Sequence, residues 1–150
     1  MADTLISTEK SSNDKTINIY MADDLKTSAA HDFFTSEYSA LIKTGAVLEK
    51  FLKQINRHQA LYADIDGTIV GMIAFKMQSP DSAWLTLAVV DPIYRKDGIF
   101  GMLYEIFEQH LAGNGITTIN SLVDTNNSAM ITAMQKHGFE TGFFRVSKKI

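Results

Sequence analysis

A strand, a glycine-containing loop and a helix follow one another in the middle of this 150-residue chain, in the stretch WLTLAVVDPIYRKDGIFGMLYEIFEQHL over 84–111. The apolar run that opens the stretch is typical of a buried strand. Asp91-Pro92 ends that strand, because proline has no N–H to donate to a sheet ladder. Gly98 and Gly101 stand in the next segment. Apolar side chains then recur at the spacing of one helical face: Ile99, Phe100, Leu103, Ile106, Phe107 and Leu111. The stretch therefore predicts a sheet strand with a helix packed beside it.

The loop and the first turn of the predicted helix form a candidate anion site. The first helical N–H groups have no acceptor within the helix, and the helix dipole adds partial positive charge at that end. Gly98 and Gly101 let a ligand approach the backbone, and Arg95 and Lys96 add charge. Neither the P-loop pattern nor the three-glycine dinucleotide pattern is present. A tight turn that binds nothing is the alternative.

Composition narrows the class of protein. The 45% hydrophobic and 21% charged residues are those of a soluble globular protein, and a net charge of −3 argues against nucleic acid as the main partner. The lack of cysteine excludes disulfides and thiolate nucleophiles, and His31 and His58 stand alone, so no metal site is expected. No apolar run approaches the roughly 18 residues of a membrane span, and the N-terminus has no signal-peptide core. We therefore expect a cytoplasmic protein without a membrane or nucleic-acid partner.

The rest of the chain alternates between strand and helix patterns. Polar residues 1–15 predict a mobile tail, and 16–150 is expected to be one domain. Asp23 or Asp24 is the expected cap of the first helix. Asp66-Gly67 between two apolar runs predicts a hairpin. The expected elements are a strand over 16–20, two helices that meet at Gly45, strands over 60–65, 68–75 and 84–90, the helix over 99–111, a strand over 116–123 parallel to the one before the helix, a helix over 128–137 and a closing strand over 141–148.

Two segments together suggest a family. One reads VDPIYRKDGI over 90–99, and the other consists of Asn127, a short helix and KHGF over 136–139. This combination resembles the GNAT superfamily of acyl-CoA-dependent N-acyltransferases, over about residues 16–148. In that family Arg/Gln-x-x-Gly-x-Gly/Ala holds the pyrophosphate of coenzyme A, and an Asn…Gly-Phe segment lies beside the pantetheine arm. The element order β-α-α-β-β-β-α-β-α-β also matches. We therefore expect an α+β fold with a mixed, mostly antiparallel central sheet flanked by helices.

The resemblance implies an N-acetyltransferase that moves an acetyl group from acetyl-CoA to a primary amine of a small molecule or peptide, by direct attack in a ternary complex. The strand that ends at Val90 and the strand over 116–123 would splay apart to admit the cofactor. A backbone N–H near Val89 or Val90 would stabilise negative charge on the acetyl oxygen. A homodimer is a further expectation from the family. The residues implied to hold the cofactor are Val89, Val90, Arg95, Lys96, Asp97, Gly98, Ile99, Phe100, Gly101 and Asn127.

The chain departs from the family pattern at three places. Phe100 stands at the final Gly/Ala position, with Gly101 one place later. Met134 stands where many members have a tyrosine that protonates the departing thiolate, and a thioether cannot donate a proton. No acidic residue stands between 82 and 90, where many members have a glutamate that acts as general base. The catalytic group is therefore left open. The remaining candidates for acid catalysis or for ordering the amine are His137, Asn120 and Ser121.

Two alternatives to an enzyme follow from the same residues. A non-catalytic acyl-CoA-binding or sensing module would keep the fold and lose the chemistry, as Met134 suggests. A structural domain would bind no cofactor at all. Tyr104 is expected to pack in the core, whereas Phe33, Phe34 and Tyr38 are core residues that could also wall an acceptor pocket. No acidic or basic cluster in the sequence identifies the acceptor amine.

Overall fold

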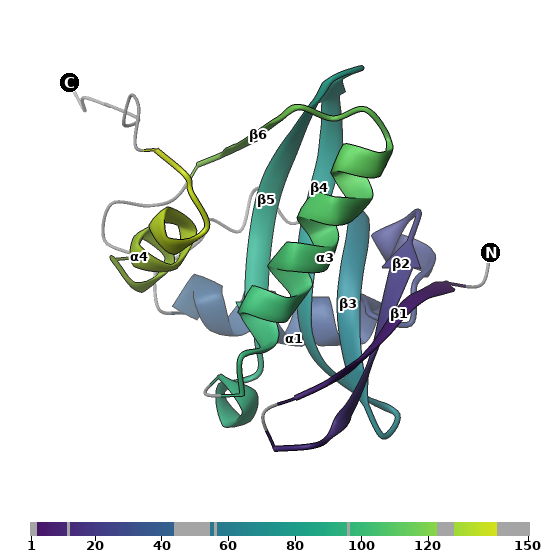
Figure 1. The fold of residues 1–150 in the computed structure, drawn as a ribbon. Coiled ribbons are helices and arrows are strands. Elements are labelled where there is room, and N and C mark those ends of the chain that lie inside the picture. Colours follow the sequence, from purple (N-terminus) through teal and green to yellow (C-terminus); the bar gives the residue numbers. More distant parts are fainter. Residues whose placement is uncertain are drawn as a thin grey trace.

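The structure, a computed structural model, describes residues 3–11, 13–43, 55, 57–95, 97–122 and 128–140. In these residues one sheet contains six strands in the order of the chain, β1 to β6 (Figure 1). Neighbouring strands are antiparallel from β1 to β5, and β6 is parallel to β5. The sheet is therefore mixed and mostly antiparallel, as predicted. The strands are β1 (Thr4–Lys10), β2 (Thr16–Ala22), β3 (Gln59–Ile65), β4 (Thr68–Ser79), β5 (Ser82–Val90) and β6 (Thr118–Ser121).

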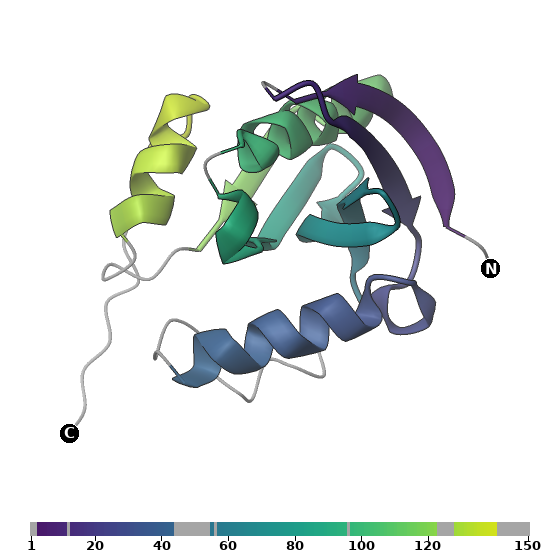
Figure 2. The same cartoon turned by 90° about the horizontal axis from the view of Figure 1, so that it is seen from below.

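Helices cover both faces of the sheet. Figure 2 shows the sheet between α1 on one side and α3 on the other, with α4 beside α3. None of the helices in the described ranges is long and apolar enough to cross a membrane. The α-helices are α1 (His31–Lys43), α3 (Ile99–Gly113) and α4 (Ser128–Lys136), and the short 3-10 turns are η1 (Leu25–Thr27) and η3 (Pro92–Tyr94).

Each face of the sheet has its own hydrophobic core. On one face α3 packs on β2 to β5, and its buried side chains follow the predicted stripe: Ile99, Leu103, Tyr104, Phe107 and Leu111. On the other face Phe34 and Tyr38 of α1 pack with Met72, Leu87 and Val89. Burying a side chain of this size contributes about 1.5–3 kcal/mol, so both helices are held mainly by their apolar faces.

A β-bulge in β5 changes which face its side chains meet. Leu85 pairs with Phe75 and Leu87 pairs with Ala74, so Thr86 is an extra residue on β5. Before the bulge Leu85 points toward α3, whereas after it Leu87 points toward α1. A strict alternation along the strand would have placed both on one face. The bulge lies where β5 begins to leave β6.

Strand β1 is the largest difference from the sequence prediction. The polar composition predicts a tail for residues 1–15, but the structure places Thr4–Lys10 in an edge strand along the whole of β2. An open strand edge offers N–H and C=O groups to any extended segment, so polar residues can add a strand without a buried face. Side chains reinforce the pairing: Thr8 Oγ1 donates to Asn18 Oδ1 (3.0 Å) and Lys10 Nζ donates to Thr16 Oγ1 (2.9 Å).

Most other elements form where the sequence predicts them. The hairpin turn at Asp66-Gly67 has positive φ at both residues, and β5 and β6 are parallel neighbours as expected, although β6 is shorter than predicted. Asp24 caps the 3-10 turn η1 rather than α1, because its carboxylate accepts from Lys26 N–H and the chain turns again before His31. The second helix of the expected pair, the joint at Gly45 and the closing strand over 141–148 lie outside the described residues.

Candidate active site

The loop after β5 is held in place by its own backbone and by Asp91. The Asp91 N–H donates to Val70 O (2.8 Å), which extends the ladder by one bond beyond the strand. Its carboxylate then accepts from Ile93 N–H (3.0 Å) and caps η3, with Pro92 in the first turn. Arg95 Nε donates to Val90 O (3.2 Å), so the side chain folds back on the end of β5. The predicted strand end is thus confirmed, and the loop leads directly into α3.

The N-terminus of α3 is left without a side-chain cap. Gly98 is its N-cap in the left-handed region, with φ of 74°, and the first turn contains no acidic residue. The Gly98 carbonyl accepts from Met102 N–H (3.2 Å), which starts the helix. The N–H groups of Ile99, Phe100 and Gly101 precede any intrahelical acceptor and point out of this end. Together with the helix dipole they form the arrangement that binds anions.

Gly71 on β4 lets this end of α3 lie close to the sheet. A Cβ atom at Gly71 would stand 3.0 Å from Ile99 Cγ2 and 3.3 Å from both Leu103 Cδ1 and Val90 Cγ2. These distances are at or below ordinary van der Waals contact, so a side chain at this position would push the first turns of α3 outward. The first turn is therefore positioned against the end of β5 by a missing side chain on the neighbouring strand.

The described part of β6 pairs with only the first half of β5. The last pair between the two strands is Leu85 with Ser121, and no residue of β5 after Leu85 pairs with β6 in the part of the chain that the structure describes. Ser121 Oγ donates to Leu85 O (2.8 Å) and closes the ladder at this point. The next residue is the bulged Thr86, whose Oγ1 is buried and, alone among described side-chain atoms of that kind, has no hydrogen-bond partner.

The ladder geometry shows which backbone groups face the edge of β5 toward β6. Because Asp91 N–H points to β4 at Val70, the alternation along β5 also directs the N–H and C=O of Val89 to β4. The groups of Ala88 and Val90 consequently point the other way, toward the gap beside β6. The bond from Arg95 Nε to Val90 O, on the side away from β4, agrees with this assignment. Of the two predicted residues, only Val90 directs its backbone groups away from β4, whereas those of Val89 face β4. Ala88, which the sequence analysis did not name, faces the same side as Val90.

The candidates for acid catalysis fall in different places. Met134 is buried, with 4% of its surface exposed, and belongs to the core under α3. The ring of His137 lies 4.5 Å from that of Tyr104 and 5.6 Å from that of Phe100 (centroid distances), so it covers the first two turns of α3. Asn120 pairs with Trp84 of β5, and its Nδ2 donates to Gln78 Oε1 (3.0 Å) on β4. The structure therefore brings His137 to the anion end of α3 and keeps Asn120 and Ser121 at the closed end of the gap.

Tyr104 packs in the core, as the sequence predicts. Its ring contacts those of Phe107, Phe139 and His137, and 2% of its surface is exposed. Burial, with a smaller effect of the Glu108 carboxylate, raises the pKa of Tyr104 to about 12. The phenol is therefore neutral at physiological pH and titrates only in strong alkali.

Glu37 on α1 is a residue of this region that the sequence reasoning missed. Burial raises the pKa of its carboxyl, the charge of Asp91 raises it further, and Arg95 lowers it. Glu37 therefore lies within electrostatic reach of the loop after β5, from the face opposite α3. The available signal was its place on the first helix, between the buried Phe34 and Tyr38. The sequence analysis named Phe33, Phe34 and Tyr38 of this helix as possible walls of an acceptor pocket, but no pattern singled out Glu37.

Two of the predicted cofactor residues, Lys96 and Asn127, lie outside the described residues. Asp97 is described, and its carboxylate is turned toward Asn13 and Lys15 on the turn between β1 and β2. Phe100 is partly buried against the core under α3. No cluster of three or more metal-ligating side chains occurs in the described ranges.

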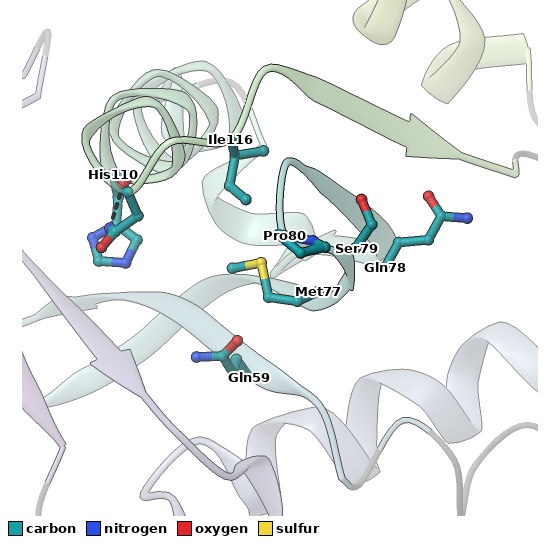
Figure 3. Close-up of a pocket in the computed structure, with 8 residues that line it drawn as sticks. Gln59, Met77, Gln78, Ser79, Pro80, His110 and Ile116 are labelled. Atoms are coloured by element: carbon teal, nitrogen blue, oxygen red, sulfur yellow. Dashed lines mark hydrogen bonds between the residues drawn. The ribbon is translucent and has the colours of Figure 1, made fainter.

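A cavity of about 460 Å³ lies at the opposite end of α3, away from this loop (Figure 3). Its wall combines the end of β4 and its turn, the last turn of α3 and Gln59 of β3. Amide, hydroxyl and imidazole groups line it together with Met77 and Ile116, and it has no carboxylate or ammonium group. Asn114 Nδ2 donates to His110 O (2.7 Å) at its edge. This cavity carries none of the predicted site residues.

Comparison with known proteins is consistent with this geometry. Residues 14–139 match the sequence profile of the acetyltransferase (GNAT) family. Comparison with curated proteins finds no match.

Three solved structures are similar in fold. A ribosomal-protein-alanine N-acetyltransferase from Brucella melitensis biovar Abortus 2308 has a TM-score of 0.67 at 14% identity, over 89% of this chain and 99% of that chain. The aminoglycoside N-acetyltransferase AAC(6')-Iy in complex with CoA has a TM-score of 0.62 at 15% identity, over 97% of both chains. Ard1 from Thermoplasma volcanium has a TM-score of 0.55 at 24% identity, over 56% of this chain and 57% of that chain. At these identities the likeness shows the fold.

Proposed function

The chain belongs to the acetyltransferase (GNAT) family, and we propose that it transfers an acetyl group from acetyl-CoA to a primary amine of a small molecule or peptide in a ternary complex. One observation carries the proposal: the uncapped N-terminus of α3 lies beside the edge of β5. The N-terminus of α3 offers hydrogen-bond donors to a diphosphate, and the edge of β5 offers backbone groups to an extended ligand. Acetyl-CoA contains both groups in one molecule.

The anion end of α3 fits the diphosphate of coenzyme A. The N–H groups of Ile99, Phe100 and Gly101 are unblocked by any acidic side chain of the first turn. Gly98 takes the left-handed conformation that starts the helix at this point, and nothing lies within 4 Å of where its Cβ would be. The ligand therefore has room to approach the backbone. Arg95 adds positive charge in the loop before this end.

The edge of β5 fits the amide-bearing pantetheine arm. Val90 N–H and both backbone groups of Ala88 face the gap, so they can pair with an extended ligand as a strand would. The buried Thr86 Oγ1 without a partner adds a hydroxyl at the inner end. When bound, acetyl-CoA supplies an acetyl group activated as a thioester. We assign the Ala88 N–H, rather than that of Val89, as the donor to the acetyl oxygen, because it points into the gap.

Glu37 is our candidate for binding the acceptor amine and taking its proton. It approaches the end of β5 from the α1 side, next to side chains that pack on Val89 and Leu87. A carboxylate attracts an ammonium acceptor, and a raised pKa makes it a better proton acceptor near neutral pH. The family's usual glutamate in the strand before the loop has no counterpart here. Glu37 is thus an alternative source of the same chemistry from another element.

A non-catalytic acyl-CoA-binding module is the second candidate, and the burial of Met134 favours it. At the usual position of the acid this chain has a thioether that is 4% exposed and packs in the core. A thiolate is a good leaving group, so transfer without an acid would be slower but not prevented. Both candidates require cofactor binding, and they differ only in turnover.

Binding and turnover are tested separately. Free acetyl-CoA at about 100 times its Kd stabilises the folded state by about 2.7 kcal/mol, which is a clear rise in Tm. Release of free CoA on addition of a panel of primary amines then distinguishes the enzyme from the binding module. Stabilisation without CoA release across the panel would favour the module. No stabilisation at millimolar acetyl-CoA would contradict both. We propose the cytoplasm as the location, supported by the absence of cysteine.

A further inference from the structure

Asp97 stands one residue before Gly98, the N-cap of α3, whereas Asp24 and Asp91 are themselves the N-caps of η1 and η3. Asp24 Oδ1 accepts from Lys26 N–H, and Asp91 Oδ1 accepts from Ile93 N–H, each at 3.0 Å. In both cases the amide lies two residues after the aspartate, the geometry of an Asx turn. Asp97 precedes Ile99, the first residue of α3, by the same two residues. Its carboxylate is therefore within local reach of the first N–H of the anion end.

The Asp97 carboxylate is instead bound by another part of the chain. Its Oδ1 accepts from Asn13 Nδ2 (3.2 Å), and its Oδ2 lies 3.8 Å from Lys15 Nζ. Both partners belong to the turn between β1 and β2, which lies beside the start of α3 in both views (Figures 1 and 2). Lys15 Nζ also lies 5.4 Å from the centre of the Tyr94 ring in the same loop. α3 consequently begins without a side-chain cap.

The turn that holds Asp97 is itself well ordered by hydrogen bonds. Ser11 N–H donates to Lys15 O (2.9 Å), and Ser11 Oγ accepts from the N–H groups of Asn13 (3.3 Å) and Lys15 (3.0 Å). Ser11 is buried. Asp14 adopts a left-handed conformation, with φ of 60°, which closes the turn. Asn13 and Lys15 are thus presented toward Asp97 by a preformed turn, and little entropy is lost when they bind it.

The turn lies at the boundary of the match to the family, and Lys15 falls inside that match. The match to the family begins at residue 14, so β1, Ser11 and Asn13 precede it. A carboxylate on the Ile99 N–H would occupy one donor and would repel a diphosphate at the same place. Such a cap would stabilise the helix and weaken binding of the diphosphate. The turn between β1 and β2 removes this conflict by giving Asp97 other partners.

We propose that Asn13 and Lys15 are positioning residues that keep Asp97 from capping α3 and so leave the Ile99 N–H available to the diphosphate of the cosubstrate. The inference rests on the proposed function for the identity of the anion. In this proposal Lys15 acts through Asp97 and does not contact the phosphate directly. An indirect role and a direct contact predict different CoA affinities when Asp97 is removed.

The test is a double-mutant cycle on CoA affinity, measured by isothermal titration calorimetry. Asn13→Ala with Lys15→Ala is compared in the wild type and in an Asp97→Ala background. In the wild type we expect CoA binding to weaken about tenfold, the effect of one blocked hydrogen bond to a charged group. In the Asp97→Ala background the same pair should change the affinity by less than about twofold. Weakening of equal size in both backgrounds, or none in the wild type, would overturn the proposal.

Lys10→Ala is the matched control for charge. Lys10 lies on the same hairpin, but its Nζ donates to Thr16 Oγ1 and does not contact Asp97. It removes the same positive charge, so an equal loss of CoA affinity would show that only the general field of the hairpin matters and would contradict the proposal. Thermal unfolding of each variant shows whether the hairpin still folds.

A measurement without cofactor keeps the inference separate from the proposed function. In the ligand-free protein, we expect the Ile99 amide NMR signal to follow the titration of a carboxyl group only after Asn13→Ala and Lys15→Ala, and to lose this response with Asp97→Ala. An Ile99 signal that is insensitive to pH in every variant would overturn the inference even if CoA binds tightly. A protein that shows the expected Ile99 response and binds no CoA would contradict the proposed function alone.

Discussion

The two ends of α3 differ in how their terminal backbone groups are hydrogen-bonded. At the C-terminal end Asn114 N–H donates to Leu111 O, its side chain donates to His110 O, and Gly115 N–H donates to Ala112 O. At the N-terminal end Gly98 is a cap without a side chain, and the nearby Asp97 is bound elsewhere. Both ends have a glycine with positive φ, 74° at Gly98 and 82° at Gly115.

This difference in capping indicates which end of α3 serves packing and which is available to a ligand. Unsatisfied helix-terminal groups cost stability when no partner is near, so a helix that serves only packing is closed at both ends. This helix is closed only at the end that meets the cavity of Figure 3. The N-terminal end has no side-chain cap, and beyond Leu85 the described part of β6 does not pair with β5. Within the described residues these two features lie in one region, and the proposed cofactor site is built on both.

The largest expected effect concerns Glu37, whose carboxyl lies within electrostatic reach of Asp91 and Arg95 in the loop before α3. Glu37→Gln should lower kcat/KM by about 10²-fold, the lower range for loss of a general base, while the Kd of CoA stays the same. Since burial and Asp91 raise its pKa, wild-type activity should fall as pH decreases through that raised value, because the protonated carboxyl accepts no proton. The acidic limb should disappear in the variant. Asp32→Asn, a charge loss at a fully exposed position of α1, is the control; equal losses in both variants would contradict the role.

Gly98→Val and Gly115→Val compare the two ends directly. Both residues have positive φ and open space around the missing Cβ, so each substitution should cost about 1–2 kcal/mol of folding stability or more. Only Gly98→Val moves the amides of the anion end, and CoA affinity should fall about hundredfold through loss of charge-assisted hydrogen bonds. Calorimetric titration with CoA and thermal unfolding measure the two effects. Similar CoA affinities in the two variants would remove the distinction between the ends.

Gly71→Val tests how α3 is positioned at its first turn. The new side chain would meet Ile99 Cγ2 and Leu103 Cδ1, and overpacking of this kind costs about 2 kcal/mol. CoA binding should weaken as well, because the anion end moves relative to β5. Gly113→Val adds the same atoms at the other end of α3, where nothing lies within 4 Å, and should change stability by less than about 0.5 kcal/mol. Unchanged urea unfolding for Gly71→Val would show that this region can relax around the added group.

Asn114→Ala should have the smallest effect. It removes the side-chain bond to His110 O and should lower the free energy of unfolding by about 1 kcal/mol. The Kd of CoA should not change, since the cap lies a whole helix length from Gly98. Weaker CoA binding in this variant would show that the two ends of α3 are coupled and would contradict their separate roles.

Local signals in the sequence predicted most of the framework. The Asp66-Gly67 turn, the strand end at Asp91-Pro92 and the stripe along α3 all form as expected, because each depends on residues close together in the chain. The start of α3 after Gly98 was also predicted, and the anion site expected there stays a prediction. The hypothesis of a cofactor loop came from this local chemistry and from the family resemblance.

Other features depend on partners that are distant in sequence. β1 forms because the edge of β2 accepts a strand, although its own residues look like a tail. The bulge at Thr86, next to the last described pair of β5 with β6, is defined only by the register with β4. Glu37 and Asp97 meet charges from elements far along the chain, and no spacing along the sequence reports those distances.

The order of residues was thus sufficient to locate turns and helix ends and to predict an anion site, since hydrophobic periodicity and the conformational freedom of glycine act within a few residues. It was not sufficient to show which backbone donors stay free. That depends on which strand occupies which edge and on what the Asp97 carboxylate binds. Hydrogen bonds at an edge or a helix end go to whichever group folding brings near, and here the N-terminal hairpin takes the carboxylate while the amides of α3 keep their capacity for a ligand.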